Sequence, residues 1–179
     1  MRDPAIARNY AEALFAVGER SGASESYGAL LDAFAGAAEA DLQIKVMLES
    51  PRVPKGQKLA VLDRALEGRV PPPFLRWVQA LVRRGRQTLV GEINREYQGL
   101  INVKLNRVHA GVTLARAADP GFRAEITRRL SEALEKEVIP HFREDPHLLG
   151  GVVVRIGDTV IDGSVRQRMQ QLRRQMLGS

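Results

Sequence analysis

The apolar residues change their spacing once along the chain, near residue 105, and this change limits the folds that the chain can adopt. Before it, apolar residues recur every three or four positions, which is the period of an amphipathic helix. After it, the stretch VHAGVTL places apolar or small residues at every second position, which is typical of a strand. We therefore predict a mainly α protein with two domains, a six-helix bundle over residues 1–105 and a small α+β domain over residues 106–179.

Caps, prolines and glycines set the predicted helix ends in the first domain. Asp3-Pro4 suits the start of the first helix, because Asp can accept from free backbone amides and Pro fits the first turn. Ser21-Gly22 ends this helix. The other five helices are predicted to begin near Ser24, Asp41, Pro54, residues 71–73 and Gln87, and the last of them runs to Lys104.

The second domain is predicted to have the order β-α-β-β-α. Its elements are a strand over residues 108–114, a helix from Asp119-Pro120, strands at 151–156 and 160–161, and a last helix from residue 164. The stretch VIPHFRE leaves two outcomes open, because Pro140 either confines a strand to a sheet edge or breaks it. About 75 residues give only a marginal core, so we expect this domain to be the more mobile one and to depend on a partner for order.

The composition excludes several kinds of site and location. The chain has no cysteine, which rules out disulfides, thiolate catalysis and cysteine-ligated zinc. No apolar run approaches the ~18 residues that a membrane span needs. The first residues carry spread charges and no continuous apolar core, unlike a signal peptide. We expect the protein to stay in the cytoplasm or on the cytoplasmic side of a membrane.

The positive charge of the chain is spread out rather than clustered. The formal net charge is +6. Up to Leu105 there are 15 basic and 12 acidic residues, and after it 12 and 9, so that each part carries +3. Specific nucleic-acid binders usually gather their basic residues and add aromatic platforms. We therefore expect no nucleic-acid partner.

A search for catalytic and ligand-binding motifs finds none. No phosphate-binding loop and no dinucleotide-binding glycine motif occurs. The acidic and histidine residues at 141–147 are interpreted as a solvated loop, and His109 as a structural residue without a partner. Asp158 and Asp162 suit turn and cap hydrogen bonds. The sequence therefore predicts no enzyme, no cofactor and no metal site.

Three stretches resemble one known family. GGVVVRIGDTVIDGSVRQRMQQL, from Gly150, is similar to the C-terminal signature of the delta subunit of F-type ATP synthases, the bacterial equivalent of the mitochondrial oligomycin-sensitivity-conferring protein. ARNYAEALF resembles the opening of that family, and Gly85-Arg86 also fits. Met169 stands where leucine is more usual, and Pro140 stands where family members have an alternating strand. The resemblance covers the whole chain.

The resemblance implies a non-catalytic stator subunit that resists rotor torque during proton-driven ATP synthesis. In this family the helical domain binds the N-terminal helix of an alpha subunit of the catalytic head, in a groove between its first and fifth helices. The C-terminal domain meets the b subunits of the peripheral stalk. The resemblance also implies one copy per complex, located peripherally on the cytoplasmic face of the cell membrane, without direct membrane insertion.

Small and apolar residues on the predicted helices supply the candidate contacts. The residues expected to bind the alpha-subunit helix are Tyr10, Ala13, Leu14, Val17, Trp77, Ala80 and Leu81. Of these, Tyr10 and Ala13 match the family motif, whereas Leu14 and Leu81 suit the core as well as the groove. The residues expected to meet the stalk are Val165, Arg168, Met169 and Leu172.

Two other functions remain open at this stage. The helical first domain also resembles the fold of the bacterial antitermination factor, so an RNA-binding protein is one alternative. It would bind oligonucleotides with a strong dependence on salt. The other alternative is an enzyme of unknown type, whose activity would depend on pH and on Asp158 or His147.

Overall fold

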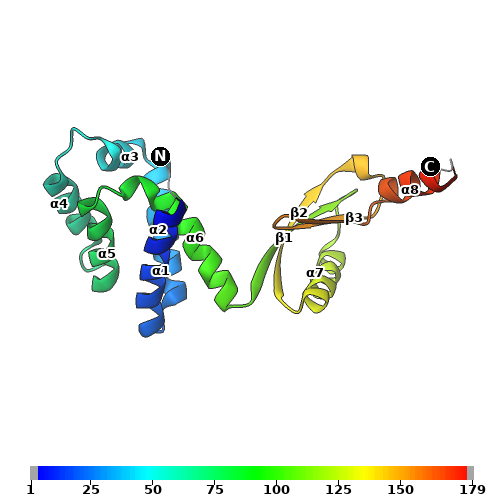
Figure 1. The fold of residues 1–179 in the computed structure, drawn as a ribbon, viewed down its shortest axis with the longest axis horizontal. Coiled ribbons are helices and arrows are strands. Elements are labelled where there is room, and N and C mark those ends of the chain that lie inside the picture. Colours follow the sequence, from blue (N-terminus) through cyan, green and yellow to red (C-terminus); the bar gives the residue numbers. More distant parts are fainter. Residues whose placement is uncertain (1–3, 177–179) are drawn as a thin grey trace. The chain divides into compact units, whose positions relative to one another are not determined.

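The computed structural model describes residues 4–176, which divide into two compact units, one up to Ile101 and one from Asn102 (Figure 1). The described part of the chain is mainly helical, with a four-stranded sheet in the second unit. This confirms the expected mainly α class with strands only in the C-terminal part. The predicted cap at Asp3 lies outside the described residues.

Six α-helices make up the first unit and its end. They are α1 (Pro4–Arg20), α2 (Ser24–Ala40), α3 (Leu42–Glu49), α4 (Lys55–Leu66), α5 (Pro72–Arg83) and α6 (Val90–Lys104). The helix predicted from Gln87 instead begins with a short 3-10 turn, η1 (Gln87–Leu89), and α6 starts after it. Such turns are frequent at helix N-termini. At α3 the predicted cap is present, because the Asp41 carboxylate accepts from the amide of Gln43 at 2.7 Å.

The core of the first unit is formed by the inner faces of these helices. Its largest fully buried apolar side chains are Tyr97, Phe74, Leu14, Leu31, Leu81 and Ile93. The Tyr97 hydroxyl donates to the backbone carbonyl of Ser24 at 2.9 Å, which satisfies the phenol inside the core. Burial raises the pKa of Tyr97 above its ordinary value. Gly28 allows α2 to approach α6, since a side-chain carbon there would overlap Ile101.

The second unit contains a mixed sheet, one covering helix and a terminal helix. Its elements are β1 (Arg107–Leu114), α7 (Pro120–Leu134), β2 (Glu137–Glu144), the 3-10 turn η2 (Pro146–Leu148), β3 (Val152–Ile156), β4 (Thr159–Asp162) and α8 (Val165–Met176). The strand order is β2-β1-β3-β4. β1 pairs in parallel with β2 and antiparallel with β3, and β4 is antiparallel to β3.

The stretch around Pro140 forms β2, so the second unit has one strand more than the predicted β-α-β-β-α order. β2 lies at an edge of the sheet, with Pro140 opposite Ala110 of β1. An edge strand tolerates proline because one of its sides needs no amide donor. Of the two outcomes that the sequence leaves open, the edge strand is therefore confirmed.

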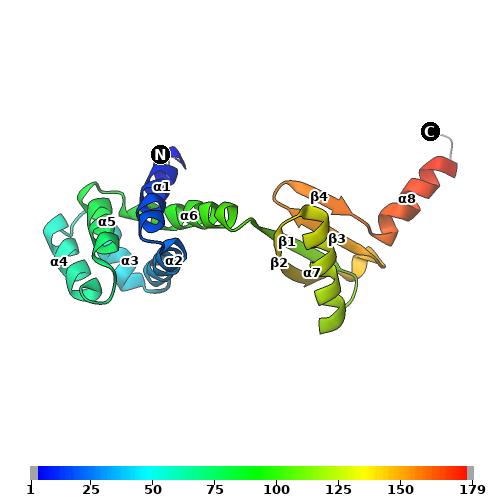
Figure 2. The ribbon, with the colours of Figure 1, turned by 90° about the horizontal axis from the view of Figure 1, so that it is seen from below.

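A small core lies between the sheet and α7. Ala110, Val112 and Leu114 of β1 are buried together with Val138 and Val154. α7 covers this face of the sheet, and its Ile126, Leu130 and Leu134 contact the cluster (Figure 2). In contrast, α8 has no buried residue among those described and extends away from the sheet in Figures 1 and 2.

Candidate partner-binding surfaces

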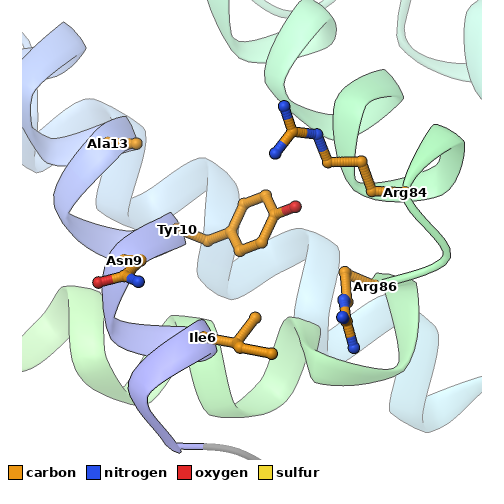
Figure 3. A pocket seen from close by; sticks show the side chains of 6 residues that line it. All are labelled: Ile6, Asn9, Tyr10, Ala13, Arg84 and Arg86. Atoms are coloured by element: carbon orange, nitrogen blue, oxygen red, sulfur yellow. The ribbon is translucent and has the colours of Figure 1, made fainter.

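A groove lies beside α1 in the first unit, and we call it the α1–α5 groove. It has a volume of about 590 Å³. Its lining residues are Ile6, Asn9, Tyr10 and Ala13 of α1, with Arg84 and Arg86 after α5 (Figure 3). The four α1 residues share one face of the helix because they are spaced three and four apart. The groove is therefore built by one helix face and the turn that follows α5.

The neighbouring face of α1 fixes this helix against the rest of the unit. Ala7, Ala11 and Leu14 are fully or almost fully buried. From α5, the indole Nε1 of Trp77 donates to the backbone carbonyl of Tyr10 at 3.2 Å. This hydrogen bond joins the two helices directly beneath the groove-lining face. The groove is thus carried by helices that are packed together and is not formed by a loose loop.

Two of the predicted groove residues line the groove. Tyr10 is partly exposed, and its ring points from α1 toward the segment that carries Arg84 and Arg86 (Figure 3). Ala13 is exposed one turn further along α1. Because the Ala13 side chain is a single methyl group, a docked helix could approach α1 closely at this point.

The other predicted residues lie elsewhere. Leu14 and Leu81 are 0% exposed, so these two candidates are core residues and cannot line a groove. The helical period alone could not separate them from the groove face, because buried and lining residues form adjacent stripes. Trp77 is also buried, and Val17 and Ala80 are partly exposed but are not among the lining residues.

Sequence reasoning missed Ile6, Asn9, Arg84 and Arg86 as groove residues. Ile6 lies four positions before Tyr10, so the helical spacing could have identified it. The arginines depend on the turn after α5. There Gly85 has φ 68°, and the Arg86 amide donates to the Leu81 carbonyl at 2.8 Å. This C-terminal turn places both arginines at the groove, which a linear pattern does not reveal.

The α1–α5 groove combines an apolar part with a basic wall. Arg84 and Arg86 are exposed. Within residues 4–176, no carboxylate lies within ion-pair distance of either guanidinium. Ile6 and Ala13 supply apolar contact area on the α1 side. The groove therefore suits an amphipathic segment better than a small polar ligand.

A second surface lies on α8, and we call it the α8 stripe. It consists of the exposed residues Val165, Met169, Leu172 and Met176. A hollow of about 370 Å³ is lined by the last three together with Arg173. Val165, Met169 and Leu172 are predicted stalk contacts, and the fourth, Arg168, is exposed beside them. Met176 is an addition, found at the same spacing one turn later.

Hydrogen bonds at its first turn attach α8 to the sheet. The Val165 amide donates to the Gly150 carbonyl at 3.0 Å. The Ser164 hydroxyl accepts from the Gln167 amide at 3.2 Å, as an N-cap does. The Asp162 carboxylate accepts from the Ser164 amide at 2.9 Å. Hydrogen bonds from the backbone amide and the side chain of Ser164 to this carboxylate, followed by the charge of Arg166, lower the pKa of Asp162.

Another hollow, which we call the α7–β3 pocket, was not anticipated from the sequence. It has a volume of about 810 Å³ and lies between α7, the end of β1 and the start of β3. Phe122 and Leu149 border it and are exposed. Arg116 and Arg129 also line it. Its lining comes from three separate segments, so no local sequence pattern could have predicted it.

The region interpreted as a solvated loop at 141–147 is partly strand, because His141 and Glu144 belong to β2. His109 is likewise not without a partner, since its Nδ1 lies 3.0 Å from Nε2 of His141 and the two rings stack. Parallel pairing of β1 and β2, a contact distant in sequence, brings them together. Among the described residues, no group of three acidic or histidine side chains could hold a metal ion.

Within the described part of the chain, no helix has both the length and the apolar character needed to cross a membrane.

Comparison with known proteins gives consistent matches over nearly the whole length. A model of the family described as ATP synthase delta (OSCP) subunit matches residues 6–176. The ATP synthase subunit delta of Gemmatimonas aurantiaca is 47% identical, covering 97% of this chain and 94% of the relative.

Two further matches agree with these. The ATP synthase subunit delta of Desulforamulus reducens is 33% identical, covering 97% of this chain and 96% of the relative. A chain of the mitochondrial ATP synthase hexamer of Toxoplasma gondii has a similar fold, with a TM-score of 0.68, 19% identity, and coverage of 97% of this chain and 98% of that one. The chain therefore belongs to the ATP synthase delta (OSCP) subunit family, and is a non-catalytic component of the peripheral stalk.

Proposed function

We propose that this subunit connects the catalytic head to the b subunits of the stalk through two separate docking surfaces. The α1–α5 groove binds the N-terminal helix of an alpha subunit, and the α8 stripe contacts the b subunits. One copy serves each complex, on the cytoplasmic face of the cell membrane. The observation that carries this proposal is that each of the two compact units has a surface with accessible apolar side chains, the α1–α5 groove on one and the α8 stripe on the other.

The groove supports the head contact in its shape and its chemistry. Tyr10 and Ala13 belong to the stretch ARNYAEALF that resembles the opening of the family, and both line the groove. An amphipathic helix that lies in an apolar groove is a recurrent mode of recognition. Val17, Trp77 and Ala80 remain proposed contacts at or beneath the same surface, while Leu14 and Leu81 support it from the core.

The exposed apolar side chains of α8 support the stalk contact. Val165, Met169 and Leu172 together offer apolar area that the second unit itself does not cover. An exposed ion pair contributes only about 0–1 kcal/mol. Burial of the stripe therefore supplies most of the affinity, and Arg168 contributes mainly to orientation and selectivity.

The two units act as modules in this proposal. Residues 1–105 form a six-helix bundle that binds the head, and residues 106–179 form the α+β domain that binds the stalk. The resulting link between the head and the stalk resists the torque of the rotor during proton-driven ATP synthesis. A link built from two modules gives each partner its own surface.

A calorimetric titration tests the head contact directly. The full chain is titrated with a synthetic peptide that reproduces the N-terminal helix of its own alpha subunit, at 50 mM and 500 mM salt. We expect one-to-one binding that changes by less than tenfold between the two, because apolar burial dominates. Absence of peptide binding, together with binding of RNA that weakens steeply with salt, would instead support the RNA-binding alternative.

A further inference from the structure

The most informative surface outside the groove is α8, because its apolar spacing and its charges together define a partner. We propose that the α8 stripe forms a short coiled coil with one acidic amphipathic helix of another chain, and that the arginines beside the stripe select that charge. The inference rests on the proposed stalk contact and gives the chemistry of the helix that α8 accepts.

The spacing of the stripe is that of a coiled-coil seam. Its residues follow one another at intervals of four, three and four, from Val165 through Met169 and Leu172 to Met176. In a heptad these are positions d, a, d and a. They are 41%, 58%, 59% and 86% exposed, so nothing in the described part of the chain covers the seam. A seam this narrow fits one facing helix better than it fits a sheet.

The residues beside the seam are basic. In the same heptad register, Arg166 and Arg173 occupy e positions and Arg168 occupies a g position. Side chains at e and g meet the partner helix across the seam and set its identity. Arg174 lies at position f, on the far side of the helix from the seam. α8 contains no aspartate or glutamate.

These charges are not neutralised within the described chain. No carboxylate of residues 4–176 lies within ion-pair distance of Arg166, Arg168 or Arg173. Asp162 acts electrostatically on Arg166 but already accepts from the Ser164 amide. An incoming helix with glutamate or aspartate beside its own apolar seam would complement both sides of the stripe.

The same arginines exclude a second copy of α8 as the partner. In a parallel pair, position g of one helix faces position e of the other, and in an antiparallel pair e faces e and g faces g. Each arrangement brings arginine against arginine, since Arg166, Arg168 and Arg173 occupy those positions. Like charges placed against each other are unfavourable. The occupant is therefore a helix of different charge.

Folding back into the α7–β3 pocket of its own unit would not cover the α8 stripe favourably, because the charges of the two surfaces do not match. Arg116 and Arg129 line that pocket and would face the arginines of α8. The first turn of α8 is also fixed by the hydrogen bond from the Val165 amide to Gly150. A side-chain carbon at Gly150 would lie 3.0 Å from the Val165 side chain, which shows how closely the two segments pack.

The test uses the full chain and two synthetic 28-residue helices with the same leucine and isoleucine seam. One peptide carries glutamate at every e and g position, and the other carries lysine. At low salt we expect the glutamate peptide to bind at least tenfold more tightly. The preference should invert in the variant Arg166→Glu/Arg168→Glu/Arg173→Glu, and both peptides should lose binding in Met169→Asp/Leu172→Asp.

A matched pair of single variants separates position from net charge. Arg173→Glu, beside the seam, should weaken binding of the glutamate peptide severalfold, whereas Arg174→Glu, on the far side, should leave it within twofold of the unchanged chain. Equal affinity for the two peptides, or equal effects of the two variants, would overturn the inference. So would a dimer of the unchanged chain that the Met169→Asp/Leu172→Asp variant dissolves in sedimentation.

A soluble b-subunit fragment titrated in parallel keeps this result distinct from the proposed function. Binding of the fragment without any preference between the peptides would overturn only the coiled-coil inference. Binding of the glutamate peptide without binding of the fragment would overturn the stalk assignment and leave the inference standing.

Discussion

A substitution at Ala13 tests most directly whether a helix docks in the α1–α5 groove. It lies on the lining face of α1 and carries only a methyl group there. Ala13→Trp should reduce the affinity for the alpha-subunit peptide at least tenfold, because the indole fills the space that the docked helix needs. Stability should change little, since the side chain is exposed. Calorimetric titration and thermal unfolding measure the two effects.

The control for Ala13→Trp is the same substitution on a different helix. Ala65 of α4 is exposed and is not among the lining residues of the groove. Ala65→Trp should leave peptide binding unchanged. If both variants bind like the unchanged chain, the alpha-subunit helix docks at another surface.

The basic wall of the groove should matter less than its apolar part. Arg84 is exposed, and an exposed ion pair contributes about 0–1 kcal/mol. Arg84→Glu should therefore weaken peptide binding less than tenfold at low salt, and the loss should shrink at high salt. Titrations of Arg84→Glu and Ala13→Trp at two salt concentrations compare the contributions of the basic wall and of the apolar part to peptide binding. A larger loss in Arg84→Glu would mean that charge dominates the contact.

Sequence patterns locate the residues of a helix face but not the boundary between buried and docking faces. Tyr10 and Leu14 fit the same apolar spacing of α1, yet Leu14 is 0% exposed and Tyr10 lines the groove. The outcome depends on which neighbouring helices pack against α1, and those lie far away in the sequence. Arg86 could not be predicted for the same reason, since the turn after α5 positions it.

At the scale of elements, the first turn of α8 should respond to acid. The folded-state pKa of Asp162 is lowered, mainly by the hydrogen bonds to Ser164. Its contribution to the start of α8 is therefore fully present above the unfolded value of about 3.9 and is lost as the pH falls through the lower folded value. The protection of the Val165 and Gln167 amides from exchange, relative to their intrinsic exchange rates at each pH, should fall below about pH 4.

The Asp162→Asn variant controls for general acid unfolding. The amide side chain still offers an oxygen to the Ser164 amide but does not titrate. Exchange at Val165 should then lose its added dependence on pH, while α7 behaves as in the unchanged chain. An identical pH profile in both proteins would show that Asp162 does not fix this turn.

Elements with local signals could be predicted, and elements that need a distant partner could not. The helices follow from their apolar stripes together with caps such as Asp41 and Asp119, whose carboxylates bind amides of the first turn. β2 is different, because Pro140 disfavours a strand, and only pairing with β1 determines that the strand forms. The meeting of His109 and His141 depends on the same pairing.

For the molecule as a whole, we predict that the two modules can be separated. A chain ending at Lys104 keeps α6 intact and contains the complete α1–α5 groove. It should fold into a helical domain that binds the alpha-subunit peptide with unchanged affinity and does not bind a b-subunit fragment. Circular dichroism and calorimetry follow folding and binding. An unfolded fragment would show that the helical unit depends on the second one.

In the proposed function, one chain holds the head and the stalk at the same time. Sedimentation of the catalytic head, a soluble b-subunit fragment and this subunit, singly and in combination, measures this most directly. We predict a three-component complex that forms only when the subunit is present and that Ala13→Trp and Met169→Asp/Leu172→Asp each break at one contact. Exclusion of one partner by the other, or a head–stalk complex that forms equally well without the subunit, would contradict the account.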